Sequence, residues 1–486
     1  MESATHLVLF VSVLLLFCIA FSRFLSKVGI PVLVFFILAG MLMGSDGVGG
    51  IYFDDAAAAS VIGNFAICYI LFAGGMATKW KSVRPVLLPG ALLATVGVLM
   101  TALFVGVLAH FLVGLPWLQG LLLGSVVSCT DAASVFSILR SKNMNLKGDL
   151  APLLELESSS NDPTAYMLTI SVVSLMQTPE SGMLRFAEIF LLQFAIGALL
   201  GYLFGHIGAR LMNRMTLNSD GMYPVVAVTL AALIYTAIQT LHGNGFLGIY
   251  IAGVVMGNVK LVQKGVLVRF FDGLSWLMQI LVFVTLGLLV FPSQLPSVWL
   301  PAMAVSLLLM FVIRPAAVFL TLHPFNYSTK AKLLVSWVGF RGASSIVFAT
   351  YALTYDLPQG NVIFNMVFFI SLTSVILQGS MLAPLAAMLN QLDNDASAPV
   401  ARSITDFDDE MQGNFYELTA GDGSKAVGLT VRDLNFPGGV RIVLIRRGEA
   451  MLTPGGETKV EAGDVFMVSC DDPLKLPEIK ERLSLA

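Results

Sequence analysis

Five ionisable residues lie within stretches of this chain that are otherwise apolar. Asp131 lies in LLLGSVVSCTDAASVFSIL, Glu155, Glu157 and Asp162 lie in LAPLLELESSSNDPTAYMLTISVVSL, and Arg341 lies in LLVSWVGFRGASSIVFATYAL. A charge inside a membrane costs at least about 2.5–3.5 kcal/mol, so such residues usually pair with each other or face a watery cavity. Because carboxylates in that setting bind protons or cations, we interpret the group as an ion or proton path.

The depth of these residues supports that interpretation. At a helical rise of about 1.5 Å per residue, Asp131, Asp162 and Arg341 lie roughly 20, 18 and 17 Å into their spans. A hydrocarbon core is about 30 Å thick, so all three lie near its middle. Three separate spans are therefore expected to present polar groups at one level.

Two of these spans also contain residues that interrupt helices. Thr130 and Asp131, both poor helix formers, interrupt one span, and Gly339 and Gly342 flank Arg341 in the other. Broken helices that meet near the bilayer midplane are a common ion-binding device of secondary transporters, often within inverted repeats. We therefore predict two crossed broken helices at this level.

The spacing in ELESSSND predicts two polar pairs on a helix. Glu157 and Asn161 are four residues apart, as are Ser158 and Asp162, so each pair shares a face. We expect Glu157 to form a structural ion pair with Arg341. Ser158 and Asp162 would then be left to offer oxygen ligands to a small cation.

Composition places the chain among membrane proteins. It is 56% hydrophobic and 12% charged, with mean hydropathy +0.82, whereas soluble proteins average about 25% charged residues. We expect no nucleic-acid partner and no enzyme activity, since no nucleophile–base set or metal-ligand spacing is present. The apolar stretches predict an all-α polytopic fold of about thirteen transmembrane spans: 5–22, 30–44, 57–77, 85–111, 117–139, 150–177, 185–212, 222–241, 245–258, 273–291, 297–321, 330–355 and 361–389.

Loop charge orients these spans. With the N-terminus outside, the inner loops carry fifteen basic residues and the outer loops one, Arg185, which agrees with the positive-inside rule. The N-terminus is then periplasmic and the C-terminus cytoplasmic. The inner residues are Arg23, Lys27, Lys79, Lys81, Arg84, Arg140, Lys142, Lys147, Arg210, Arg214, Lys260, Lys264, Arg269, Lys330 and Lys332.

The C-terminal part differs in kind. We assign 1–390 to a transmembrane domain, 391–410 to a polar linker and 411–486 to a small α+β cytoplasmic domain. Strands are expected at NFYELTA, VGLTVRDL, VRIVLIRRGEAML and DVFMVSC, separated by Gly-rich turns, with a final helix at LPEIKERL. Arg446 and Arg447 offer a site for a nucleotide phosphate, although a solvated hairpin end is the preferred reading.

Three strings together resemble a known family. CTDAASVF, ESSSNDPTA and GFRGASS, in this order, are similar to the signature of NhaP-type monovalent cation:proton antiporters, in the branch of potassium/proton antiporters linked to cell-volume regulation. The C-terminal part resembles the RCK-C, or TrkA-C, regulatory module. The resemblance covers all the expected spans. It implies electroneutral exchange of K⁺ or Na⁺ for H⁺ by a homodimer in the bacterial inner membrane, without a cofactor and with a small-molecule regulator of the C-terminal domain.

The resemblance also assigns roles. It implies that Asp162 binds the cation or the proton, with ligands from Ser158 and Thr130, and that Thr130 and Asp131 compensate helix ends. Asn161 marks electroneutral exchange, and Glu157 and Arg341 form the structural ion pair at the site. Ala73 departs from the pattern, since several relatives carry an acidic residue there.

Two other functions compete with antiport. Regulatory modules of this type also gate channels, but no TVGYG-like selectivity filter is present. A sodium-coupled solute symporter on a related fold would need a wider cavity. Arg314, beside Pro315 near the inner end of span 297–321, either contacts the pore or extends toward the membrane surface or the helix end, and the second interpretation is preferred.

Overall fold

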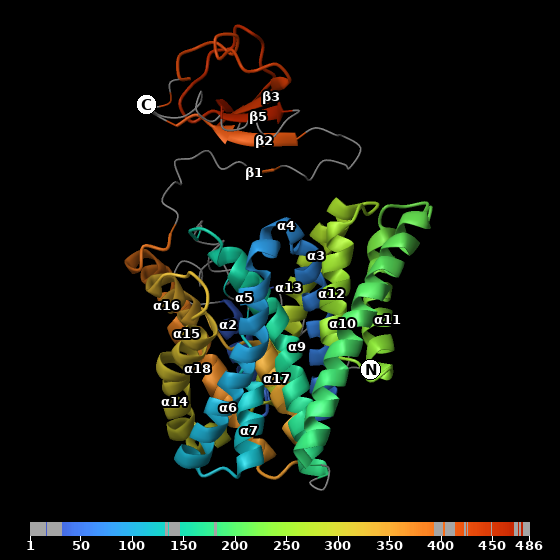
Figure 1. Ribbon diagram of the computed structural model, residues 1–486, viewed down its shortest axis with the longest axis vertical. Coiled ribbons are helices and arrows are strands. Elements are labelled where there is room, and N and C mark those ends of the chain that lie inside the picture. Colours follow the sequence, from blue (N-terminus) through green and yellow to red (C-terminus); the bar gives the residue numbers. More distant parts are fainter. Residues whose placement is uncertain are drawn as a thin grey trace. The chain divides into compact units, whose positions relative to one another are not determined.

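The computed structural model describes residues 32–131, 146–178, 182–392, 414–421, 426–448 and 450–470, with the shorter pieces 16, 135, 402–403, 424, 475 and 478–479. The chain divides into two compact units, Met1–Leu392 and Asp393–Ala486, each described by itself. Figure 1 shows that the first unit is built from helices and that the second contains a sheet.

Long apolar helices dominate the described part of the first unit. Seven of them are long and apolar enough to cross a membrane, and α2, α7, α12 and α17 are shorter apolar helices. The polytopic helical fold is thus confirmed, whereas the number thirteen remains a prediction because the span 5–22 lies outside the described residues except for Leu16. The helices are α2 (Val32–Met43), α3 (Ala56–Ala77), α4 (Trp80–Val83), α5 (Leu87–Leu92), α6 (Val98–Leu108), α7 (Trp117–Val126), α9 (Leu150–Gln177), α10 (Gly182–Arg214), α11 (Met222–Thr240), α12 (Gly245–Asn258), α13 (Lys264–Leu289), α14 (Trp299–Leu308), α15 (Arg314–Thr321), α16 (Thr329–Trp337), α17 (Ala343–Thr354) and α18 (Gly360–Met388).

Short non-α turns join some of these helices into continuous spans. A 3₁₀ turn (Arg84–Val86) and a π-helical turn (Leu93–Gly97) link α4, α5 and α6, and a second π-helical turn (Leu309–Ile313) links α14 to α15. π-helical turns inside α-helices often mark functional sites, because they rotate the side chains that follow. The second of these turns ends directly before Arg314.

Helices α3 and α12 pack closely through glycine. A Cβ added at Gly75, Gly253 or Gly257 would lie 2.4–2.7 Å from a backbone oxygen of the opposite helix, so no larger residue fits there. Small residues let membrane helices approach closely enough for extensive van der Waals contact. Both helices also contact α9, the helix that carries most of the predicted site residues.

The expected interruptions lie where the sequence placed them. α7 ends before a non-helical segment at 127–131, and residues 338–342 separate α16 from α17. The remainder of the fifth expected span lies outside the described residues, apart from Val135. The backbone N–H of Asp131 donates to the carbonyl of Phe340 at 2.8 Å, so the two interruptions lie side by side.

The second unit contains an antiparallel sheet with the strand order β1-β2-β5-β3-β4. Leu418, Ile445, Phe466 and Val468 alternate toward its core and are fully buried. The strands expected at NFYELTA, VRIVLIRRGEAML and DVFMVSC are confirmed. They are β2 (Asn414–Thr419), the pair β3 (Val440–Arg447) and β4 (Ala450–Leu452), and β5 (Val465–Cys470), beside the short β1 (Arg402–Ser403).

The strand expected at VGLTVRDL is wrong. Residues 427–434 form turns with a single bridge between Thr430 and Lys459. The Thr430 hydroxyl donates to the Asp433 carboxylate at 2.6 Å, which is the local side-chain bonding that competes with a sheet ladder. Most of the expected linker and of the final helix lies outside the described residues.

Candidate functional site

Asp162 lies in the middle of α9 and is only 8% exposed. Its Oδ2 accepts a hydrogen bond from Ser344 Oγ at 2.6 Å. Its Oδ1 is buried and has no hydrogen-bond partner among the described residues. Because Ser344 is the second residue of α17, the positive end of that helix approaches the carboxylate. A buried carboxylate oxygen without a partner is a place for a proton or a cation.

Directly before Asp162 and one turn earlier, at Asn161, Ser158 and Glu157, α9 meets the interrupted end of α7 through hydrogen bonds. The backbone N–H of Thr130 donates to Asn161 Oδ1 at 3.2 Å, and Asn161 Nδ2 donates both to Thr130 Oγ1 and, at 3.1 Å, to Glu157 Oε1. The Thr130 hydroxyl lies 3.2 Å from Ser158 Oγ. Asn161 thus uses its amide to hold the non-helical segment against α9, and it brings Thr130 beside Ser158.

The two interruptions contact each other through side chains as well. Cys129 Sγ lies 3.1 Å from Ser345 Oγ, and both residues are buried. The Asp131 carboxylate lies against Gly342, where an added Cβ would be 2.1 Å from Oδ2. Gly342 therefore does more than interrupt the helix, because only a residue without a side chain leaves room for this carboxylate at the start of α17.

The predicted ion pair between Glu157 and Arg341 is wrong. Glu157 Oε1 forms its ion pair with Arg314 Nη2 at 2.9 Å, and both side chains are 1% exposed. Arg314 reaches Glu157 across Gly339, where an added Cβ would lie 2.7 Å from the Arg314 Nε. Arg314 therefore extends into the protein and not toward the membrane surface. The sequence did contain a signal for this pair. Arg314 lies within an apolar span, and the buried carboxylate of Glu157 needed a cationic partner.

Arg341 instead completes the ends of the interrupted helices. Its Nη1 donates to the carbonyl of Cys129 at 3.0 Å, just beyond the end of α7, and its backbone N–H donates to Ser374 Oγ at 3.0 Å. A cation at a helix C-terminus and a carboxylate at a helix N-terminus both oppose the helix dipole favourably. Arg341 at the end of α7 and Asp131 at the start of α17 form such a complementary pair of caps.

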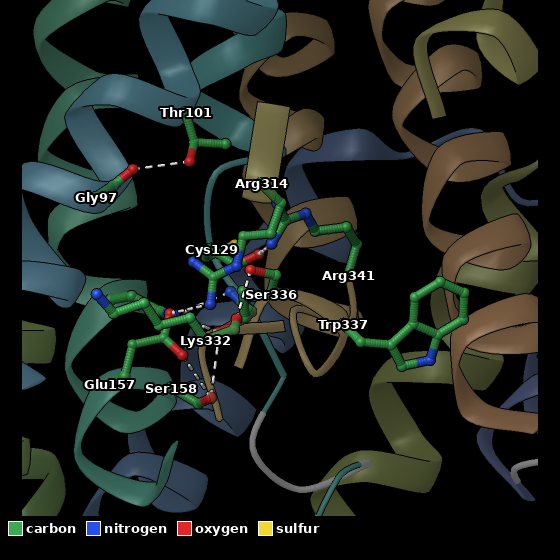
Figure 2. Close-up of polar contacts among 12 residues, drawn as sticks. Gly97, Thr101, Cys129, Glu157, Ser158, Arg314, Lys332, Ser336, Trp337 and Arg341 are labelled. Atoms are coloured by element: carbon green, nitrogen blue, oxygen red, sulfur yellow. Dashed lines mark hydrogen bonds and ion pairs between the residues drawn. The ribbon is translucent and has the colours of Figure 1, made fainter. Parts of the chain in front are cut away.

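Arg314 and Arg341 line one small pocket, whose other lining residues are the polar Ser306, Ser374 and Gln378 and the apolar Leu309, Met310 and Ile370, with Gly339. Figure 2 shows the two guanidinium groups beside each other, close to Glu157. Arg314 Nε, Arg341 Nε and Arg341 Nη2 are buried without a partner among the described residues. With Asp131, Glu157 and Asp162, the crossing holds three carboxylates and two guanidinium groups. One negative charge is left to be balanced by a proton or a cation.

The structure brings most of the predicted site residues together. Thr130, Glu157, Ser158 and Asn161 form one hydrogen-bonded cluster, and Asp162 directly follows Asn161 in α9. Sequence reasoning missed Ser344 and Cys129, because a hydroxyl or a thiol within an apolar span carries little signal by itself. Ala73 lies half-buried in α3.

Both parts of the chain match known protein families. Residues 12–388 match the family described as sodium/hydrogen exchanger, transmembrane. The chain belongs to this exchanger family. Residues 415–473 match the TrkA-C domain, so the resemblance of both parts is confirmed. The exchanger family consists of membrane transporters and not of catalytic enzymes.

Named relatives of this exchanger cover most of it. The K⁺/H⁺ antiporter NhaP2 of Shewanella sp. strain ANA-3 is 36% identical over 446 residues, which is 91% of this chain and 77% of the relative. The K⁺/H⁺ antiporter NhaP of Alkalimonas amylolytica is 41% identical over 389 residues, or 80% and 68%. The Na⁺/H⁺ antiporter NhaH of Halobacillus dabanensis is 29% identical over 314 residues, or 62% and 76%.

The exchanger unit also has a solved structural neighbour. The sodium proton antiporter MjNhaP1 from Methanocaldococcus jannaschii, solved at pH 8, aligns with a TM-score of 0.70 over 80% of this chain and 99% of that one. The two chains are 22% identical, so the likeness shows a shared fold.

Proposed function

We propose that the protein is a secondary antiporter that exchanges K⁺ or Na⁺ for H⁺ at Asp162. The observation that carries this proposal is the buried Asp162 Oδ1, which lacks a partner among the described residues although Oδ2 is held by Ser344. One carboxylate that binds either a proton or a cation, but not both, is sufficient for exchange. The relatives named as K⁺/H⁺ antiporters support potassium as a substrate, and the one named as a Na⁺/H⁺ antiporter supports sodium.

The cation site that we propose combines Asp162 with Ser158 and Thr130. Hydroxyl, carbonyl and carboxylate oxygens are ligands suited to hard cations, which bind oxygen in preference to sulfur or nitrogen. The contact between the Thr130 and Ser158 hydroxyls supports a shared ligand set, since it brings the α7 end beside the face of α9 that carries Asp162. Asn161 and Asp131 act on this set by positioning the backbone around it.

We infer that exchange is electroneutral. Glu157 is committed to Arg314, and Arg341 and Asp131 are committed to the helix ends. Only the charge of Asp162 then changes during the cycle, and either one proton or one monovalent cation cancels it. The loaded site is formally neutral in both forms, which avoids moving a net charge across the membrane.

The proposal also covers the membrane location, the orientation, the oligomeric state and the regulation of the protein. The bacterial relatives support a location in the inner membrane, and loop charge supports a periplasmic N-terminus and a cytoplasmic C-terminus. We further propose a homodimer, and a domain at residues 411–486 that regulates exchange in response to a small molecule such as a nucleotide. The match of residues 415–473 to the TrkA-C domain supports the regulatory assignment.

A cation-dependent proton-movement assay tests the proposed function. Everted vesicles that contain the protein are acidified inside, and K⁺, Na⁺ or Li⁺ is added outside while the internal pH is followed. At least one of these cations is expected to release the stored protons in a saturable manner. If none of the three moves protons beyond the level of vesicles that lack the protein, the antiport proposal is wrong.

A further inference from the structure

A groove of about 560 Å³ lies on the first unit, away from the ion site. One wall comes from α5 and α9 and the other from α10 and α12, and α4 closes one end. On α9 the groove is lined by Leu156, Ser160 and Thr164, and the last two are each two residues, and therefore about 200° of helix rotation, from Asp162. The groove and the proposed cation site thus lie on different faces of α9.

The lining of the groove is suited to a hydrocarbon chain. It contains no Asp, Glu, Lys or Arg, and residues such as Leu87, Ala91, Phe194 and Val255 make up most of it. The α5 and α10 sides of the walls belong to Trp80–Val113 and Leu184–Arg214, which are long and apolar enough to cross a membrane, and α12 is a shorter apolar helix. Leu87 and Phe194 are each 39% exposed, so the groove is open at the surface of these helices. In a membrane, that surface faces the bilayer. An apolar groove that opens onto lipid is filled by an acyl chain more favourably than by water.

The end of the groove near α4 has a different character. Trp80, Tyr202, His206 and Asn258 lie there, and the rings of Tyr202 and His206 have centroids 4.4 Å apart. Tyrosine and tryptophan are enriched where apolar surface meets lipid headgroups. This end of the groove therefore lies at the level of the headgroups, and its deeper part at the level of the acyl chains.

Basic residues lie close along the chain to residues at the same end. Lys79 and Lys81 flank Trp80 along the chain, Arg84 follows in the next turn, and Lys260 lies two residues after Asn258. All four are exposed. Positive side chains at the membrane surface attract anionic lipid headgroups, with an effect of about fivefold in affinity for each residue.

We propose that this groove is a binding site for an anionic phospholipid. The lipid places one acyl chain between the α5–α9 wall and the α10–α12 wall, and its phosphate lies among Lys79, Lys81 and Lys260. The proposal rests on the combination of an uncharged groove with an aromatic end that has basic residues beside it. The same end is basic enough to favour phosphatidylglycerol over phosphatidylcholine.

Photolabelling of the full-length protein in lipid nanodiscs tests the proposal. Phosphatidylglycerol and phosphatidylcholine with the same photoreactive acyl chain are compared, and labelled peptides are identified by mass spectrometry. Phosphatidylglycerol is expected to label the segments 87–95 and 247–259 several times more strongly. Equal labelling by both lipids, or labelling spread evenly over the lipid-facing helices, would overturn the proposal.

Two pairs of variants make the test specific. Ala91→Trp fills the groove and should reduce labelling about tenfold, while Leu103→Trp, on the same span but outside the groove, should leave it unchanged. The double change Lys79→Ser with Lys81→Ser should reduce labelling by phosphatidylglycerol about fivefold for each lysine, and Lys330→Ser serves as its control. If Ala91→Trp does not fold, Thr95→Phe fills the same groove. Unreduced labelling in the folded groove variant contradicts the site.

Discussion

Glu157 and Arg314 form a fully buried ion pair, with Oε1 and Nη2 2.9 Å apart and each side chain 1% exposed. Arg341, the arginine of the adjacent interruption, binds the Cys129 carbonyl instead. This division of labour explains why the site contains two arginines. One neutralises a carboxylate of α9, and the other caps a helix that ends inside the membrane.

Breaking the Glu157–Arg314 pair is expected to destabilise the protein strongly. Arg314→Ala leaves a buried carboxylate without its cation, which typically costs about 3–5 kcal/mol. The double variant Glu157→Gln with Arg314→Gln removes both charges and should recover part of that loss. Thermal melts of the purified proteins check this. A double variant that melts no higher than Arg314→Ala would mean that the pair is not coupled as described.

Gly342→Ala is expected to impair exchange by displacing Asp131. The added Cβ would lie 2.1 Å from the Asp131 Oδ2, so the carboxylate or the start of α17 must move. Gly273→Ala is the matched control, because a Cβ there meets nothing within 4 Å and alanine favours a helix interior by about 0.5–1 kcal/mol. Exchange rates and melting curves of both variants are compared. Equal activity of the two would show that the close approach is not needed.

The C-terminal domain should lose stability in acid through Asp464. Burial raises the pKa of Asp464, but hydrogen bonds from Arg447 and from the Glu461 N–H outweigh that effect, and the pKa lies below its ordinary value. Stability from this carboxylate is therefore present above about pH 4 and is lost as the pH falls through the lowered value.

Hydrogen exchange of the full-length protein measures this dependence. Protection of β3 and β5 should decline below pH 4 in the wild type. Asp464→Asn should lower protection at pH 7, and the difference between variant and wild type should shrink in acid. If the difference stays constant from pH 7 to pH 3, the ionised Asp464–Arg447 pair is not its source.

Steady exchange should produce no current. An exchange that moved one net charge per cycle would gain or lose about 2.3 kcal/mol for each 100 mV of membrane potential. With only Asp162 changing its charge, the rate in proteoliposomes should stay the same when a potential of either sign is imposed. A sustained current on a solid-supported membrane after a cation jump would require a second titrating group in the cycle.

Much of the site could be predicted because charge in an apolar span is expensive. Asp162 and Asp131 stand out for that reason, and the spacing around Asn161 places it on α9 beside them. The prediction that Arg341 pairs with Glu157 was wrong because the two residues were matched by their similar depth along their spans. Arg314 lies nearer the inner end of its span, but its side chain reaches Glu157 across Gly339. The sequence does not show this path, because it depends on the packing of three helices.

Other contacts could not be predicted from the sequence. Ser344 can donate to Asp162 because it lies at the start of α17. The sequence alone does not show at which residue the 338–342 interruption ends and α17 begins. In the C-terminal domain, the alternating pattern of residues 427–434 matched a strand, but the Thr430–Asp433 contact favours turns. Local hydrogen bonds of this kind override a pattern of alternating hydrophobicity.

Asp162 is the carboxylate that we propose to bind both ions. Asp162→Asn keeps the shape of the side chain and its hydrogen bond with Ser344, but it can neither take up a proton nor neutralise a cation. Asn161→Asp, which adds a carboxylate beside the site, and Asp272→Asn, an exposed change on α13, are the controls.

Cation-driven proton movement in proteoliposomes, with a melting curve for each variant, is the most direct measurement. Asp162→Asn is expected to melt like the wild type and to show no exchange above protein-free liposomes, while Asp272→Asn exchanges normally. Asn161→Asp should still exchange, with altered stoichiometry or stability. Substantial exchange by folded Asp162→Asn would contradict the account and would direct attention to Asp131.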